Sequence, residues 1–215
     1  GKVDGILCPP LMALKFPGSL IVPGVGIATS GGIPSPLLQS KKLISEVKTI
    51  FINEQYAYWE DWLKIVLSFI NSSSDTMSLN ITRKEMGNEE SFLIDGLKGK
   101  EKREGVYEYN LGELWKQVSI YPMVCWVWVC HGDSDYRQIR NVLGHIWDEA
   151  KENLIQLKRG TFKCDEIPEE FITRIDDIRN VYYNLASLEF EGVHWLVEQA
   201  KKYDIVSEDV DIHIC

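Results

Sequence analysis

The sequence predicts an α/β protein, and three observations lead to this prediction. Residues 123–130, MVCWVWVC, form a nearly unbroken apolar run bounded by Pro122 and Gly132. Such a run is typical of a strand buried on both faces, which requires helices on both sides of a largely parallel sheet. Strand-like and helix-like segments also alternate along the first half of the chain, and amphipathic helical segments follow the apolar run.

Length and composition allow a substantial core. The chain has 215 residues, of which 45% are hydrophobic, so it can form one large domain or two smaller lobes. The net charge is −9, and residues 131–215 carry 18 acidic but only 10 basic side chains. This balance argues against nucleic acid as a partner and is typical of solvated helix surfaces. No apolar run is long enough to span a membrane, so we expect no membrane partner either.

The cysteines indicate neither a disulfide framework nor a metal centre. There are five, an odd number without paired spacing, at positions 8, 125, 130, 164 and 215. This usage fits a reducing cytosol, so we expect a cytoplasmic protein. Cys125 and Cys130 are five residues apart on the predicted strand, so their side chains should point to opposite faces. Zinc ligands are usually two to four residues apart, and we expect no metal site.

The predicted strands occupy residues 3–8, 20–29, 35–40, 47–52, 91–95 and 123–130. Residues 56–70 form a helix, because their apolar positions recur at helical spacing. A short helix begins at Asn110, which has the spacing of an N-cap with a return contact from Glu113.

The last third of the chain is expected to be helical. Asp133 or Ser134 can cap a long helix that ends near Gly160. Its apolar face comprises Tyr136, Ile139, Leu143, Ile146, Ala150, Leu154 and Leu157. Pro168 suits the first turn of a second helix, with Phe171, Ile175, Ile178 and Tyr182 inward. Ser187 can cap a third, with Phe190, Val193, Leu196, Val197 and Ala200 inward.

This order of elements is compatible with two architectures. One is a single doubly wound sheet. The other consists of two lobes, in which the chain leaves the first lobe near Lys41 and returns to it near Met123.

Two features are candidates for chemistry. The turn around Gly31 and Gly32 can present backbone N–H groups and the hydroxyls of Ser30 and Ser35 to an anion. An ordinary linker between strands explains the same composition equally well. His131 follows the buried strand at a position where α/β sheets often form ligand crevices, although a solvated or structural histidine is the more common case.

Several stretches resemble the menaquinone-pathway family that contains chorismate dehydratase. VPGVGIATSGGIPSPLLQS is similar to the family's PGxxIxSxGPVxSVxLFS, and VYEYNLGELWKQVSIYPMVCWVWV to its YDLGEEWKxxTGLPFVFAVWV. Residues 183–195 follow its YxL…ELEGLxxF pattern, and nearly the whole chain is covered.

The resemblance implies a type-2 periplasmic-binding-protein-like fold with two α/β lobes and a ligand cleft between them. Residues 1–44 and 123–215 would form lobe 1, and residues 45–122 would form lobe 2. The family's first βα unit has no counterpart here, so we expect roughly 30 or more residues to precede this segment in an active form.

The resemblance also implies the site residues. Ser35 aligns with the serine of GPVxSV and would act in catalysis; Ser30, Gly31 and Gly32 would contact the substrate with it. Where the family has SSRTS, this chain has QYAYW, so Tyr56, Ala57 and Tyr58 would contribute backbone donors and phenols. Asp95 stands beside the position of the acid in the family's IGD.

The implied activity is that of a cofactor-free hydro-lyase that converts chorismate, a small anionic substrate, to 3-[(1-carboxyvinyl)oxy]benzoate on the futalosine route. The alternative is a two-lobe protein that binds a small anionic or aromatic ligand without chemistry.

Overall fold

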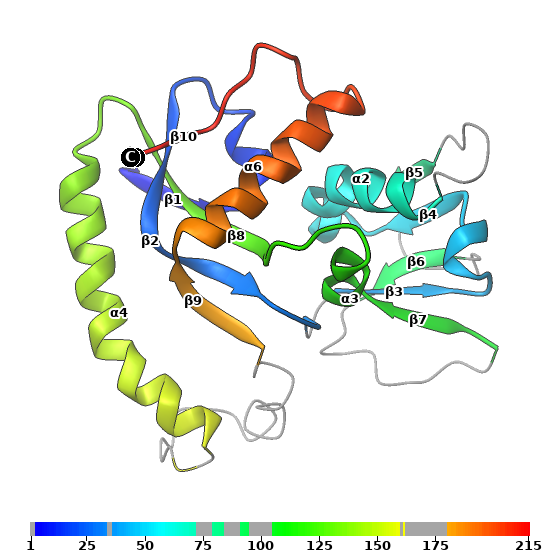
Figure 1. The fold of residues 1–215 in the computed structure, drawn as a ribbon, viewed down its shortest axis with the longest axis horizontal. Helices are drawn as coiled ribbons and strands as arrows, with labels where there is room; N and C mark the ends of the chain where they lie inside the picture. Colours follow the sequence, from blue (N-terminus) through cyan, green and yellow to red (C-terminus); the bar gives the residue numbers. More distant parts are fainter. Residues whose placement is uncertain are drawn as a thin grey trace.

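The computed structural model describes residues 3–33, 36–71, 79–83, 91–94, 105–159, 161 and 180–215. Its strands form two five-stranded sheets, with helices packed against them (Figure 1). The predicted α/β class is therefore confirmed, and the arrangement is the one with two sheets rather than one doubly wound sheet.

The first sheet has the long strands β2 and β8 at its centre. Its strands are β1 (Gly5–Cys8), β2 (Ser19–Thr29), β8 (Met123–His131), β9 (Val181–Leu185) and β10 (His213–Ile214). Their order is β1-β8-β2-β10, and β9 pairs with the second half of β2 on the edge whose first half pairs with β10.

The expectation of a largely parallel first sheet is wrong. β8 runs antiparallel to both β1 and β2, β9 runs antiparallel to β2, and only the short β10 is parallel to it. The path of the chain explains the difference. The end of β2 lies beside the start of β8, where Thr29 pairs with Met123, because the chain leaves the first sheet and returns to it at the same place; these two neighbours therefore run in opposite directions.

The second sheet is built from the segment between these two strands. It has the order β5-β4-β6-β3-β7, formed by β3 (Leu37–Ser40), β4 (Thr49–Ile52), β5 (Asn80–Arg83), β6 (Ser91–Ile94) and β7 (Tyr107–Asn110). The pairing places β3 in this sheet, although the predicted lobe boundary at 44/45 assigned its residues to lobe 1. The exact division of the chain into lobes stays a prediction.

Helices cover the central strands of the first sheet from both sides. The helices are α1 (Pro10–Ala13), α2 (Glu60–Ile70), α3 (Leu111–Lys116), α4 (Tyr136–Lys158) and α6 (Ser187–Lys202), with 3₁₀ turns η1 (Ile44–Glu46) and η2 (Glu54–Trp59). α4 packs with Cys130 in one core cluster, whereas Val193 of α6 packs with Val127 and Val129 in another (Figure 1). The prediction that the apolar run is a strand covered by helices is confirmed.

Several helix details differ from the predictions. The helix expected over residues 56–70 begins as the 3₁₀ turn η2 and becomes α-helical only at Glu60. α4 is capped by Asp135, whose carboxylate accepts the N–H of Gln138 at 3.2 Å, rather than by Asp133 or Ser134. The inward face of α4 is shorter than predicted, because Ile146 is 57% exposed.

Tyr182 lies in a strand, not in a helix. The segment VYYNL forms β9 because its β-branched and aromatic residues suit a strand and because the edge of β2 is open to pair with it. Phe171, Ile175, Ile178 and the start of the predicted helix at Pro168 lie outside the described residues.

The start of α6 is held by a buried carboxylate instead of the predicted Ser187 cap. Glu189 accepts the backbone N–H of Ala186 at 2.7 Å and the hydroxyl of Tyr182 at 2.9 Å. Burial and this hydrogen bond raise the pKa of Tyr182 far above its ordinary value. The predicted inward residues Val193, Leu196, Val197 and Ala200 are buried.

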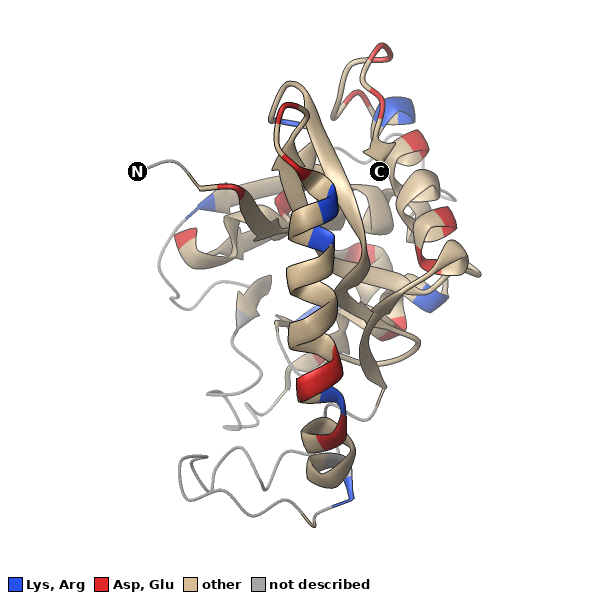
Figure 2. Ribbon diagram, turned by 90° about the vertical axis from the view of Figure 1, so that its left-hand side faces the viewer, with Lys and Arg blue, Asp and Glu red and all other residues tan. Residues whose placement is uncertain are grey.

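Among the described residues of the last third, the acidic side chains are mostly exposed, as expected. Asp148, Glu149 and Glu152 are exposed and lie in the second half of α4, where the ribbon of this helix carries the colour of acidic residues in Figure 2. Two basic residues, Arg137 and Arg140, lie near its start.

The two connections between the sheets touch each other at glycines. A methyl group built on Gly112, in α3, would lie 1.9 Å from the carbonyl oxygen of Gly31. No side chain fits there, because the obstructing atom belongs to the backbone. In contrast, a methyl group on Gly144 of α4 would meet no atom within 4 Å.

We predict opposite effects for two glycine-to-alanine changes. Gly112→Ala should destabilise the fold by about 1–3 kcal/mol or more, because the added methyl group overpacks the crossing. Gly144→Ala should stabilise it by about 0.5–1 kcal/mol, because alanine is more favourable than glycine inside a helix and the added methyl group has room. Urea unfolding followed by circular dichroism measures both. A Gly112→Ala protein as stable as the wild type would contradict the close crossing.

Three cysteines of the first sheet region are buried as free thiols: Cys8, Cys125 and Cys130. Burial raises the pKa of Cys8 from 9.0 to about 11 and that of Cys125 to about 12, because the thiolate loses its solvation. The raised values favour the protonated thiol in the folded state. This contribution to stability is complete below pH 9 and is lost as the pH rises through 11 and 12.

Alkylation should therefore be suppressed in the native protein. At pH 9 we expect iodoacetamide to modify Cys8 and Cys125 far more slowly in the folded chain than in urea, because only the thiolate reacts. Peptide mass spectrometry after timed quenching measures each site, with the half-buried Cys215 as internal comparison. Equal rates in folded and unfolded protein would contradict the raised pKa values.

Candidate binding site between the two sheets

One side of the region between the sheets is formed by the loop after β2. The hydroxyl oxygen of Thr29 accepts the N–H of Gly31 at 3.1 Å, and the N–H of Ser30 donates to the carbonyl of Asn180 at 3.3 Å. The side chain of Asn110 holds Ile33, further along this loop. Its Oδ1 accepts the N–H of Ile33 at 2.8 Å, and its Nδ2 donates to the carbonyl of Ile33 at 2.6 Å. The loop is therefore fixed by hydrogen bonds with Thr29, Asn110 and Asn180.

Asn110 also joins the two connections. Its Oδ1 accepts the N–H of Gly112 at 3.0 Å, so it caps α3 as predicted while holding Ile33. The N–H groups of Ser30, Gly31 and Ile33 are thus engaged within the protein. This arrangement suits an ordered connection, and the assignment of Ser30, Gly31 and Gly32 to substrate contact stays a prediction.

A second part of this region is η2, which carries three predicted contact residues. Asn53 begins this turn by accepting the N–H of Gln55 at 3.1 Å, and the N–H of Tyr56 donates to the carbonyl of Asn53. Tyr56 is only 8% exposed, whereas Ala57 and Tyr58 are half-buried. The other two predicted site residues, Ser35 and Asp95, lie outside the described residues.

Tyr58 connects η2 to the first sheet through its ring. The ring centroids of Tyr58 and Trp126, on β8, are 5.2 Å apart. The contacts then continue from Tyr58 to Trp59 at 5.8 Å and from Trp59 to Trp62 at 5.5 Å. Trp62 stacks on Trp115 of α3 at 6.1 Å. We call these five residues the aromatic chain.

A small cavity lies against the middle of the aromatic chain. Its volume is about 10 Å³, roughly the space of one water molecule. It is lined from the first sheet and its helices by Pro9, Pro10, Leu11, Val124, Cys125 and Leu196, and from the other side by Tyr58, Trp59 and Trp62. None of the lining side chains is charged. Because the cavity is lined from both sides, we call it the interlobe cavity and take it as the candidate binding site.

Two buried donors stand out at the interlobe cavity. The indole nitrogens of Trp59 and Trp62 have no hydrogen-bond partner in the part of the chain that the structure describes, although these residues are only 5% and 4% exposed. By comparison, the indole N–H of Trp115 donates to the carbonyl of Tyr121 at 2.6 Å. The aromatic chain therefore holds one satisfied and two unsatisfied indole groups.

Ion pairs surround the start of α2. Lys15, just after α1, lies 2.8 Å from the carboxylate of Asp61 and so joins the two sides of the interlobe cavity. Glu60 pairs with Lys64 at 2.9 Å and with Arg83 at 3.3 Å. Although partial burial opposes this, these two cations hold the pKa of Glu60 below its ordinary value.

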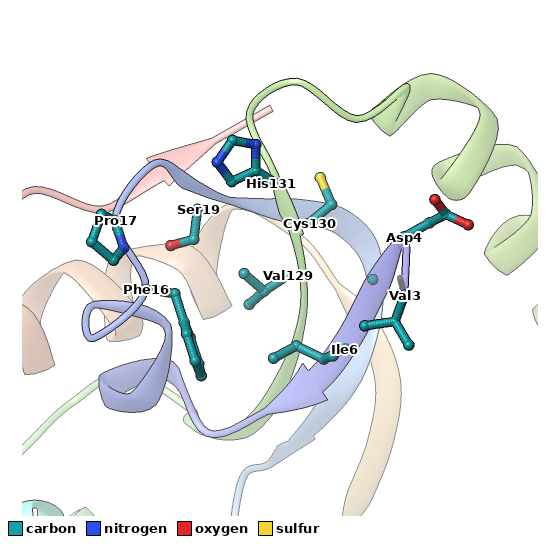
Figure 3. A pocket seen from close by; sticks show the side chains of 10 residues that line it. Val3, Asp4, Ile6, Phe16, Pro17, Ser19, Val129, Cys130 and His131 are labelled. Atoms are coloured by element: carbon teal, nitrogen blue, oxygen red, sulfur yellow. The ribbon is translucent and has the colours of Figure 1, made fainter. Parts of the chain in front are cut away.

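His131 belongs to a different place. It lies at the far end of β8 from Met123, about 25 Å away at the usual rise of a strand. It lines a second cavity, of about 200 Å³, which Phe16, Val129 and Ile6 also line, and Figure 3 shows it near Ser19 and Cys130. Its Nδ1 accepts the N–H of Asp133 at 3.2 Å, and its side chain is 62% exposed. These contacts fit the solvated, structural role considered above.

Cys125 and Cys130 fall in separate core clusters, as their spacing predicted. No group of three or more potential metal ligands occurs within the described ranges. Likewise, none of the helices described is long and apolar enough to cross a membrane.

The sequence places Trp59 and Trp62 among the apolar positions of the predicted helix over residues 56–70, where core packing is the default interpretation. As a protein that binds an aromatic ligand, the chain could use Trp59 for stacking together with Tyr56 and Tyr58, but the sequence did not identify Trp62 as a lining residue. A signal was present in the sequence: two indoles three residues apart at a helix start face the same side.

Comparisons with known proteins place this architecture. A family model described as menaquinone biosynthesis matches residues 12–202. No curated protein matches the chain. Among solved structures, the chain is similar to protein AF1704 from Archaeoglobus fulgidus, with a TM-score of 0.56 and 14% sequence identity over 95% of this chain and 81% of that one.

At that level of identity the structural match supports the fold alone, and it agrees with the predicted two-lobe arrangement. The family match extends from α1 to the end of α6 and so includes the second sheet, the strands β2, β8 and β9 of the first sheet, and both connections between the sheets. This chain therefore belongs to the menaquinone-biosynthesis family.

Proposed function

We propose that this chain is a hydro-lyase of menaquinone biosynthesis that removes water from chorismate to give 3-[(1-carboxyvinyl)oxy]benzoate. The observation that carries the proposal is the family match over residues 12–202, together with the sequence motifs at both connections. The substrate would bind between the two sheets, where the interlobe cavity lies.

The chemistry asks little of the protein. Loss of a ring proton and of hydroxide turns the cyclohexadiene ring into a benzene ring, and aromatisation supplies the driving force. The protein needs to orient the substrate, assist removal of the proton and help hydroxide leave. We assign the last role to the hydroxyl of Ser35, and contact with the substrate to the predicted residues Ser30, Gly31, Gly32, Tyr56, Ala57, Tyr58 and Asp95.

Substrate entry requires the two sides of the interlobe cavity to separate. Small-molecule sites usually measure about 300–1,000 Å³, whereas this cavity has about 10 Å³. The contacts that must open are the ring contact of Tyr58 with Trp126 and the ion pair of Lys15 with Asp61. Both cross from one side to the other, and the two connections near Gly31 and Gly112 would act as the hinge.

A second candidate function is binding of an aromatic ligand without chemistry. The uncharged, aromatic lining of the interlobe cavity favours it, because Tyr58, Trp59 and Trp62 offer rings for stacking. A thermal-shift panel of chorismate, benzoate and 3-hydroxybenzoate separates the candidates. Stabilisation by chorismate with turnover favours the lyase, and stabilisation by the benzoates alone favours the binding protein.

Turnover tests the lyase directly. Chorismate incubated with the purified chain should be converted to 3-[(1-carboxyvinyl)oxy]benzoate, detected by chromatography and mass spectrometry. Ser35→Ala should lower the rate by one to two powers of ten, on the order of the 1.5–3 kcal/mol of a hydrogen bond to a charged group, with little change in melting temperature.

Ser45→Ala is the matched control, because Ser45 is exposed on η1, away from the interlobe cavity. It should change neither rate nor stability. Absence of product from the wild-type chain would reject the lyase, and a Ser35→Ala protein that melts early yet turns over normally would make Ser35 structural.

A further inference from the structure

We propose that the indole N–H groups of Trp59 and Trp62 are hydrogen-bond donors to a ligand in the interlobe cavity. The ligand class is a ring compound with an uncharged oxygen acceptor, that is, an ether, hydroxyl or carbonyl oxygen. The proposal rests on the site of the proposed function but holds for either candidate, since it concerns recognition and not the chemical step.

The unsatisfied donors are the first argument. A buried N–H without an acceptor costs about 1–3 kcal/mol, and folded proteins leave few of them. Here the two residues that carry such groups, Trp59 and Trp62, both line the interlobe cavity and are three positions apart in the sequence. Trp115 shows that the same aromatic chain can satisfy an indole, since its N–H reaches the carbonyl of Tyr121. An acceptor that enters the cavity would recover the cost at Trp59 and Trp62.

The other residues that line the interlobe cavity indicate that the acceptor is uncharged. Pro9 and Pro10 have no N–H, and the thiol of Cys125 is directed at the carbonyl of Met123. The basic side chains nearest in sequence to the lining are already paired: Lys15 with Asp61 and Lys64 with Glu60. A carboxylate would therefore be desolvated without a counter-ion, which is costly, whereas an uncharged oxygen needs only the two N–H groups.

The ring of the ligand follows from the aromatic chain. When Tyr58 moves away from Trp126, both rings become stacking surfaces for a flat ligand. The oxygen at the edge of that ligand can then reach the indole groups of Trp59 and Trp62, which line the same cavity as Tyr58. Chorismate carries suitable hydroxyl and ether oxygens on its ring, so the proposed substrate fits this class while its carboxylates would be held elsewhere.

Acetophenone, ethylbenzene and benzoate are matched probes of this idea. They have similar size and differ in having an uncharged oxygen, no oxygen or a carboxylate. Each is titrated into the ¹⁵N-labelled chain while the indole N–H signals are followed by NMR, with saturation-transfer measurements as an independent test of binding. The two signals are assigned by their loss in Trp59→Phe and Trp62→Phe. If a variant does not fold, nuclear Overhauser contacts assign them in the wild type. The Trp115 signal is the internal control.

We expect acetophenone to bind about three- to tenfold more tightly than ethylbenzene, as one or two net hydrogen bonds would give, and more tightly than benzoate. The Trp59 and Trp62 signals should move downfield with acetophenone, and the Trp115 signal should stay. In Trp59→Phe and in Trp62→Phe, the ratio of the acetophenone affinity to the ethylbenzene affinity should fall. The ethylbenzene affinity itself shows whether the substitution has changed the shape of the cavity.

Three results would overturn the proposal: no binding of acetophenone, binding of ethylbenzene or benzoate as tight as that of acetophenone, or saturation by acetophenone with both indole signals unmoved. The chorismate assay is separate from these outcomes. Shifted indole signals without turnover would reject the lyase and keep the two donors, whereas turnover with unmoved signals would do the reverse.

Discussion

Contact between the two sheets depends on the aromatic chain. Its rings come from β8, η2, α2 and α3, so it passes from the first sheet to the elements that pack on the second. Each aromatic pair adds about 0.5–1.5 kcal/mol beyond the area it buries. One core cluster consequently includes Met123 and Leu196 from one side and Leu63 and Trp115 from the other. The uncharged character of the interlobe cavity is a result of this packing, because the same rings form its wall.

The connections between the sheets follow a different physical rule. Close approach there needs small residues and exact polar pairing, which Gly31, Gly112 and Asn110 provide. Asn110 is both the N-cap of α3 and the partner of Ile33, so the start of a helix and the passage between sheets share one side chain. A change at this residue would disturb both at once.

The sequence allowed prediction of features set by local pattern. The apolar run of β8, the inward face of α6 and the cap at Asn110 depend on neighbouring residues, and the structure has all three. Strand direction depends on the path of the whole chain, so the antiparallel pairing of β8 with β2 could not be inferred. β9 was missed because its pairing partner is distant in sequence. Helical spacing placed Trp59 and Trp62 inward but could not specify what they face.

The pairing of β2 with β8 has a consequence for how the chain folds. Thr29 pairs with Met123, and the entire segment that builds the second sheet lies between these two residues in the sequence. Bringing such distant ends together costs loop-closure entropy, and contacts of this kind slow folding. Prior folding of the inserted segment reduces that cost, since Gly31 and Gly112 then already lie in contact and hold the ends of the loop close together. The second sheet would thus form before the first, although the chain begins with strands of the first sheet.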